Sequence, residues 1–169
     1  HGQKYPVPVV LALIKQDDSF LLIKRNSPPY LGKWALVGGK WDFGEQFETA
    51  LVREVLEETG LAAEFVAWRG FVNERVQPQG EPAGAHFYLF VGEVTPLPEQ
   101  TAREQTEGAV SWFTWSQIET LHEEKRIIPS DYLMIHQFGQ AQQCLPYAEV
   151  EMVTDANYDN ARLARFDNR

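Results

Sequence analysis

The sequence has little cysteine, lacks long apolar runs and has no excess of positive charge. Its one cysteine, Cys144, rules out an internal disulfide and suits a reducing compartment, so we expect a cytoplasmic protein. No apolar run reaches the roughly 18 residues of a membrane span, and the N-terminus has no signal-peptide core, so neither secretion nor membrane insertion is predicted. Because the sequence starts at His1 rather than Met, we expect an upstream segment in the natural protein.

The net charge of −9 argues against binding of a DNA or RNA backbone, which needs a basic surface. It does not exclude a nucleotide substrate, because a bound metal ion supplies positive charge locally. The sequence also has no repeats, no low-complexity tract and no His-rich cluster typical of zinc sites. Its 169 residues, 44% of them hydrophobic, predict one globular domain over residues 1–145. Residues 146–169 are expected to form an extension, with an extra strand at 149–153 or a dimer contact.

Apolar periodicity and turn residues predict the order of the secondary structure elements. The expected strands cover residues 7–14 and 20–23 (a hairpin), 34–37, 41–43, 61–73, 85–94 and 110–114. The expected helices cover residues 46–59, a segment that begins at Ser116 with Glu119 as its capping-box partner, and residues 130–138. Strands on both sides of the helices predict an α/β fold, in which a mixed sheet is sandwiched between helices.

A glycine-rich turn, a short helix and a glycine stop follow one another over residues 39–61. The segment reads G-x5-E-x7-R-E-U-x-E-E-x-G-U, where U is aliphatic, and its fixed polar and glycine positions are Gly39, Glu45, Arg53, Glu54, Glu57, Glu58 and Gly60. On a helical wheel of about 100° per residue the last three glutamates share one arc. The opposite arc, the predicted core face, holds Leu51, Val52, Val55 and Leu56. Gly60 is predicted to end the helix in a left-handed conformation.

Three glutamates on one side of a helix are usually a solvated surface. Here, however, Glu54 and Glu58 form a like-charge pair four residues apart, which destabilises a helix by a few tenths of a kcal/mol. No Lys or Arg follows one turn later to offset the repulsion. Mg²⁺ or Mn²⁺ would remove it, because hard cations bind carboxylate oxygens and keep waters for substrate phosphates. We therefore predict that Glu54, Glu57 and Glu58 bind a divalent metal ion.

The segment matches every fixed position of the Nudix box, and from about residue 7 to 121 the chain resembles the Nudix hydrolases. The resemblance implies the α/β/α fold of that family, a Mg²⁺ or Mn²⁺ cofactor and attack by a metal-activated water on a pyrophosphate bond. It also implies that the carbonyl of Gly38 is a further metal ligand, and that Arg53 binds Glu45 and so orients the other ligands. Val37 stands where the family commonly has proline, a difference that affects loop stiffness more than chemistry.

The general base is left open between residues of two segments. Glu57 is one candidate within the box, and Glu104 and Glu107, which precede Trp112, are candidates in a loop. Arg25, at the end of the second strand, stands where similar enzymes place an arginine that contacts phosphate. Its alternative explanation is an ordinary polar strand end.

The function predicted from this resemblance is hydrolysis of a nucleoside diphosphate linked to another moiety. Pro78 lies near the position where the ADP-ribose subclass carries a proline, which favours ADP-ribose or a nucleotide sugar. The alternatives are a house-cleaning nucleoside triphosphate pyrophosphohydrolase and a regulator that binds a nucleotide without cleaving it. The intact box argues against the regulator. The expected partner is a small nucleotide rather than DNA or a membrane, and a homodimer stays open.

Overall fold

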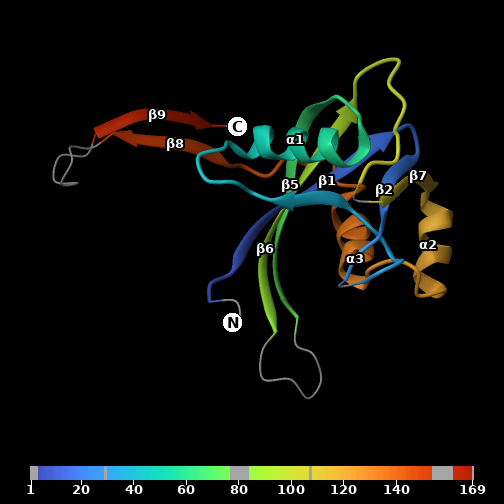
Figure 1. Cartoon of the computed structure of the whole chain (residues 1–169). Helices are drawn as coiled ribbons and strands as arrows, with labels where there is room; N and C mark the ends of the chain where they lie inside the picture. The colour runs from blue at the N-terminus through green and yellow to red at the C-terminus, as the bar shows by residue number, and fades with distance from the viewer. Residues whose placement is uncertain (1–3, 29, 77–83, 107, 154–161, 169) are drawn as a thin grey trace.

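The computed structural model describes residues 4–28, 30–76, 84–106, 108–153 and 162–168 (Figure 1). It confirms the mixed α/β fold. The strands are β1 (Val7–Gln16), β2 (Ser19–Arg25), β3 (Trp34–Ala35), β4 (Val37–Lys40), β5 (Ala63–Val76), β6 (Ala85–Pro96), β7 (Gly108–Thr114), β8 (Ala148–Val153) and β9 (Arg162–Asn168). The helices are α1 (Phe47–Thr59), α2 (Trp115–Glu123) and α3 (Pro129–Phe138).

Strand β1 lies at the centre of the seven-stranded sheet. It runs parallel to β6 along most of its length and antiparallel to β4, so that Leu11 stands opposite Gly38. The predicted hairpin with β2 is confirmed, but it is short, because only Lys15 and Gln16 pair with β2. On its other edge β2 pairs with β7 along its whole length, and beyond the hairpin it pairs with β3 at Ile23 and Lys24. This divergence leaves β4 beside β1, where it carries the glycine pair to the start of α1.

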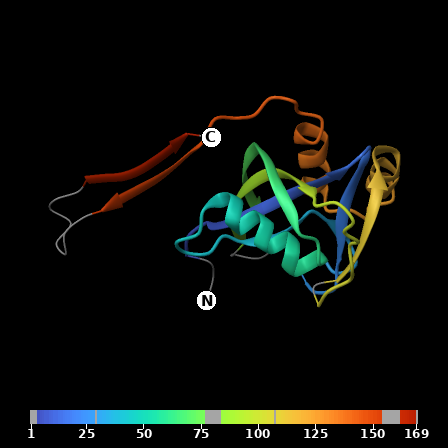
Figure 2. The same cartoon turned by 90° about the horizontal axis from the view of Figure 1, so that it is seen from above.

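The alternating side chains of β1 fill two separate cores. Val10, Ala12 and Ile14 belong to the core that contains α1, whereas Leu11 and Leu13 belong to the core that contains α2 and α3. Figure 2 shows α1 and α3 on opposite sides of the sheet. A strand buried on both faces must be apolar at consecutive positions, which explains the unbroken hydrophobic run in this part of the sequence.

Helix α1 ends as predicted but is rotated relative to the predicted core face. Gly60 has φ 70° and donates its N–H to the carbonyl of Leu56, which closes the helix. The prediction that Leu56 lies in the core is wrong, since its side chain is 52% exposed, and Phe47 and Ala50 are fully buried instead. Compared with the prediction, the side of the helix that bears Glu54 faces the glycine pair of β4, and Leu56 faces solvent.

The segment before α1 also differs from the prediction. The predicted strand at 34–37 is interrupted at Leu36, and the predicted strand at 41–43 does not form. Trp41 is still hydrogen bonded to β1, because its backbone N–H is donated to the carbonyl of Pro8 at 3.2 Å. The chain then turns away, and the indole N–H of Trp41 is donated to the carbonyl of Glu45 at 3.0 Å. Phe43 is fully exposed. This path forms a turn around Glu45 that alternation of apolar residues does not reveal.

The cap of α2 also differs from the prediction. The helix begins one residue earlier than predicted, and Thr114, not Ser116, is its N-cap residue. The partner in the capping box is Gln117, not Glu119: its side chain accepts the Thr114 N–H at 2.8 Å, and its own N–H is donated to the Thr114 hydroxyl at 3.4 Å. Thr114 with Gln117 and Ser116 with Glu119 both have the three-residue spacing of a capping box. The point at which strand β7 ends decides between the two pairs.

The C-terminal residues form a two-stranded antiparallel ribbon of β8 and β9. The extra strand predicted at 149–153 is confirmed. Figures 1 and 2 show the ribbon extending away from the body of the protein, on the side where α1 begins. The predicted domain boundary after residue 145 and the dimer contact remain predictions. Over the residues described above, no helix combines the length and apolar character that a membrane crossing requires.

Candidate active site

The two glycines of β4 allow the sheet to touch α1. Gly38 has φ 154°, and a Cβ added there would overlap the carbonyl oxygen of Val10. A Cβ added to Gly39 would lie 2.5–2.7 Å from the carboxylate atoms of Glu54. Any side chain at either position would therefore push the strand or the carboxylate away. The glycine pair thus determines how closely the helix carboxylates approach the backbone.

The predicted metal-binding glutamates lie along one side of α1 but differ in burial. The Glu54 side chain is only 12% exposed, whereas that of Glu57 is 60% exposed. Glu58 accepts the backbone N–H of Gly38 at 3.1 Å, so the structure brings this glutamate to the predicted carbonyl ligand. Burial raises the pKa of Glu54, and the neighbouring Arg53 opposes that rise.

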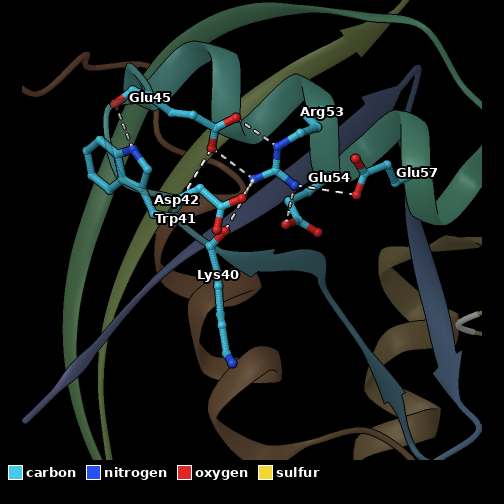
Figure 3. Close-up of polar contacts among 7 residues, drawn as sticks. All are labelled: Lys40, Trp41, Asp42, Glu45, Arg53, Glu54 and Glu57. Atoms are coloured by element: carbon cyan, nitrogen blue, oxygen red, sulfur yellow. Dashed lines mark hydrogen bonds and ion pairs between the residues drawn. The ribbon is translucent and has the colours of Figure 1, made fainter.

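Arg53 connects these carboxylates to the turn that precedes the helix (Figure 3). Its Nε and Nη2 donate to the two carboxylate oxygens of Glu45, at 2.8 and 2.9 Å. Its Nη1 donates to Glu54 at 2.7 Å and to Glu57 at 3.4 Å, and Nη2 also reaches the carbonyl of Lys40 at 3.3 Å. Hydrogen bonding to Arg53 lowers the pKa of Glu45, and the same bond raises the pKa of Arg53. A planar guanidinium suits this forked contact, which holds Glu45 and two carboxylates of α1 in one arrangement.

The turn that holds Glu45 contains a residue that the sequence reasoning missed. Asp42 donates its backbone N–H to the Glu45 carboxylate at 3.3 Å, and its own carboxylate lies 3.9 Å from Nη2 of Arg53. The signal that could have revealed it is an Asp followed by Phe and Gly, a composition typical of turns rather than strands. The turn thus places a second acidic group beside Arg53.

The donors on α1 suit a hard divalent cation. In the part of the chain that the structure describes, no three His, Cys, Asp or Glu side chains already converge as an ion-binding group. Instead, Arg53 supplies the positive charge beside Glu54 and Glu57. Mg²⁺ needs only one or two carboxylates together with waters, and the Glu57 carboxylate, with its side chain 60% exposed, is accessible to an ion. Carboxylate oxygens beside the Gly38 backbone are therefore a chemically appropriate donor set.

The remaining predicted residues have different positions. Arg25 lines a small hollow together with Ser27, Leu36, Gly38 and Glu58, so it adjoins the acidic edge of α1. Glu104 is exposed, and its neighbour Arg103 donates an N–H to the carbonyl of Thr59 at 2.8 Å, which places this loop against the end of α1. Glu107 and Pro78 lie outside the described residues.

A buried carboxylate on α3 also reaches the site. Asp131 is 7% exposed and accepts the backbone N–H of Leu36 at 2.7 Å, at the interruption between β3 and β4. Burial raises its pKa to about 7. The sequence reasoning missed it, although an aspartate at a core position of a helix is unusual and was a usable signal. The contact fixes the chain two residues before Gly38.

The sequence and the fold were compared with those of known proteins. A sequence model described as the NUDIX domain matches residues 4–138. The chain is 39% identical over 80 residues to the ADP-ribose pyrophosphatase of Methanocaldococcus jannaschii, a match that covers 47% of this chain and 46% of that protein. It is 34% identical over 86 residues to the nucleoside triphosphatase NudI of Salmonella schwarzengrund, which covers 48% of this chain and 61% of the relative.

These matches therefore span about half of each relative, and less than two thirds of either. Among solved structures, a NUDIX hydrolase from Nitrosomonas europaea has the same fold, with a TM-score of 0.66 and 23% identity. The alignment covers 83% of this chain and 93% of that one. Together with the domain match and the complete box on α1, these findings show that the chain belongs to the Nudix family.

Proposed function

We propose that the protein hydrolyses the pyrophosphate bond of a nucleoside diphosphate linked to another moiety, with Mg²⁺ or Mn²⁺ as cofactor. The single observation that carries the proposal is the Arg53 contact, which holds Glu45, Glu54 and Glu57 together next to the glycine pair. The Glu54 carboxylate lies so close to β4 that a Cβ on Gly39 would contact it. An acidic surface that only faces solvent would not need such close packing.

The residues of the chain have distinct roles in this mechanism. Glu54, Glu57 and Glu58, with the carbonyl of Gly38, would hold the cation, which when bound would offset phosphate charge and lower the pKa of a water. Arg53 keeps Glu54 and Glu57 oriented. We assign removal of the proton from the attacking water to Glu57 or to a glutamate of the loop after β6, Glu104 or Glu107.

Arg25 is proposed to contact the substrate phosphates. Its place beside Gly38 and Glu58 would put a guanidinium opposite the acidic edge of α1. Phosphate oxygens would then be held between a fixed cation of the protein and the carboxylate-bound ion. A guanidinium suits this task because it offers several N–H donors in one plane.

Two substrate classes are supported by different relatives. The likeness to an ADP-ribose pyrophosphatase, 39% identical over 80 residues, supports ADP-ribose or a nucleotide sugar. The likeness to a nucleoside triphosphatase supports a triphosphate as the second candidate. Both reactions use the same residues and differ in what lies beyond the cleaved bond.

Incubation of the protein with ADP-ribose, nucleotide sugars and nucleoside triphosphates, with Mg²⁺ or Mn²⁺, would test the proposal. Products separated by mass identify the bond that is cleaved. We expect AMP and ribose 5-phosphate from ADP-ribose, and little turnover with EDTA. The Glu57→Gln, Glu58→Gln double variant should lose hydrolysis, and Glu119→Gln, an exposed helical glutamate on α2, is the matched control. Hydrolysis by the double variant at the wild-type rate would refute the mechanism.

A further inference from the structure

Helix α1 does not cap its own N-terminus. Its N-cap residue, Gln46, makes no side-chain hydrogen bond to the first turn. The N–H of Phe47, the first residue of the helix, is instead donated to the carboxylate of Glu149 at 2.9 Å, from a residue 102 positions later in strand β8. A carboxylate at this place satisfies an N–H that the helix leaves unpaired and interacts favourably with the partial positive charge of the helix N-terminus.

Three contacts attach the segment just before Glu149 to the body of the protein. The ring of Tyr147 stacks on Trp68 with centroids 5.4 Å apart and an interplanar angle of 23°, and it meets the ring of Phe47 edge-on at 5.8 Å. Just before it, Leu145 donates its N–H to the carbonyl of Trp68 at 3.3 Å. The segment that leads into β8 is thus attached to β5 and to the start of α1. A cap carried on an attached segment loses less entropy on forming than one on a free tail.

The start of α1 is connected to the candidate site through Glu45. Phe47 is fully buried, and Glu45, two residues before it, is the carboxylate that Arg53 binds through two nitrogens. If the first turn of the helix opens, Glu45 moves with it, and Arg53 loses the contact that orients Glu54.

We propose that Glu149 is a positioning residue of the active site: by capping α1 it keeps Glu45 in contact with Arg53. This inference rests on the proposed function, and it assigns a role to a residue beyond the matched domain, which ends at residue 138. The ribbon of β8 and β9 is then a support for the catalytic helix.

Amide hydrogen exchange measured by NMR tests the cap itself, independently of any substrate. The variants are Glu149→Ala and Glu149→Gln, and the control is Glu151→Ala, because Glu151 lies two residues further along the same strand and its exposed carboxylate is 3.9 Å from Arg165. We expect Glu149→Ala to speed exchange of the Phe47 and Ala50 amides about 5-fold, the usual effect of losing a cap. Glu149→Gln should give a smaller increase, because its amide oxygen still accepts a hydrogen bond, and the control should match wild type.

Steady-state kinetics with the best substrate at saturating Mg²⁺ tests the positioning role. We expect Glu149→Ala to lower kcat by up to about 5-fold with KM nearly unchanged, Glu149→Gln to recover part of the loss, and Glu151→Ala to behave as wild type. If the Phe47 and Ala50 amides of Glu149→Ala exchange at the wild-type rate, Glu149 does not cap the helix. Faster exchange with unchanged kcat would overturn the positioning role. If the wild type hydrolyses nothing, the proposed function fails, while exchange still decides whether Glu149 caps the helix.

Discussion

Replacing Arg53 with alanine tests the contact on which the whole site depends. Three hydrogen bonds of 2.7–2.9 Å join its guanidinium to carboxylate oxygens of Glu45 and Glu54, whose side chains are only 19% and 12% exposed. A hydrogen bond to a charged group contributes about 1.5–3 kcal/mol, and removing one partner of a buried pair leaves the other charge unpaired. Glu57 is 60% exposed and its contact is 3.4 Å, so it adds little.

Because Arg53 itself is 26% exposed, water recovers part of this loss. We expect Arg53→Ala to lower the free energy of unfolding by about 2–4 kcal/mol in the absence of divalent ions. Arg53→Lys should lower the free energy of unfolding somewhat less, because lysine keeps the positive charge but cannot donate through two nitrogens to Glu45. Activity should fall by about 10- to 100-fold in Arg53→Ala, as is typical when a group that orients metal ligands is removed.

Urea denaturation followed by tryptophan fluorescence, in EDTA, measures the stability change. Arg126→Ala is the matched control, because Arg126 pairs with Glu124 at the same 2.8 Å while its side chain is 57% exposed. That control should change stability by less than about 0.5 kcal/mol. If Arg53→Ala proves as stable as the Arg126 variant, Arg53 does not hold the site together and the reasoning is wrong.

Three further predictions concern the surroundings of this contact. Gly39→Ala should lower activity about 10- to 100-fold, because its Cβ would displace the Glu54 carboxylate, and assays across a Mg²⁺ titration will show whether metal affinity changes. Phe47→Ala should lower the free energy of unfolding by about 3–5 kcal/mol, as for other fully buried phenylalanines, measured in urea. Burial raises the Asp131 pKa from 3.8 to about 7, so ionisation of this group opposes folding, and the stability it contributes falls as pH rises from about 4 to 7. Asp131→Asn should therefore become more stable relative to wild type over that range, by up to about 4 kcal/mol, and a constant difference between pH 4 and pH 8 would contradict the assignment.

Much of the box could be predicted because it depends on short-range geometry. The helix ends where the glycine at position 60 allows a left-handed residue, and the shared side of Glu54, Glu57 and Glu58 follows from the period of the α-helix alone. The forked contact between Arg53 and Glu45 was expected from the resemblance to the family, and the structure has that contact.

Several of the errors and omissions involve neighbours that are distant in the sequence. Periodicity placed Leu56 in the core, but the buried side of the helix instead includes Phe47, whose ring contacts Trp68 of β5 at 4.8 Å. Two of the residues not foreseen, Asp131 and Glu149, accept backbone N–H groups 95 and 102 positions away. No local sequence pattern reveals such a pair, because the donor is a backbone N–H and its acceptor lies far along the chain.

The sequence by itself thus determined the type of chemistry: a helix edge with three carboxylates, an arginine and two glycines at fixed spacing. The tertiary structure decided how those groups are oriented. It left only 12% of the Glu54 side chain exposed but 60% of the Glu57 side chain, brought Arg25 beside Gly38, and supplied a cap for α1 from the C-terminal ribbon. The physical reason is that spacing along one helix is set by its own hydrogen bonds, whereas burial and capping depend on which distant segments pack against it.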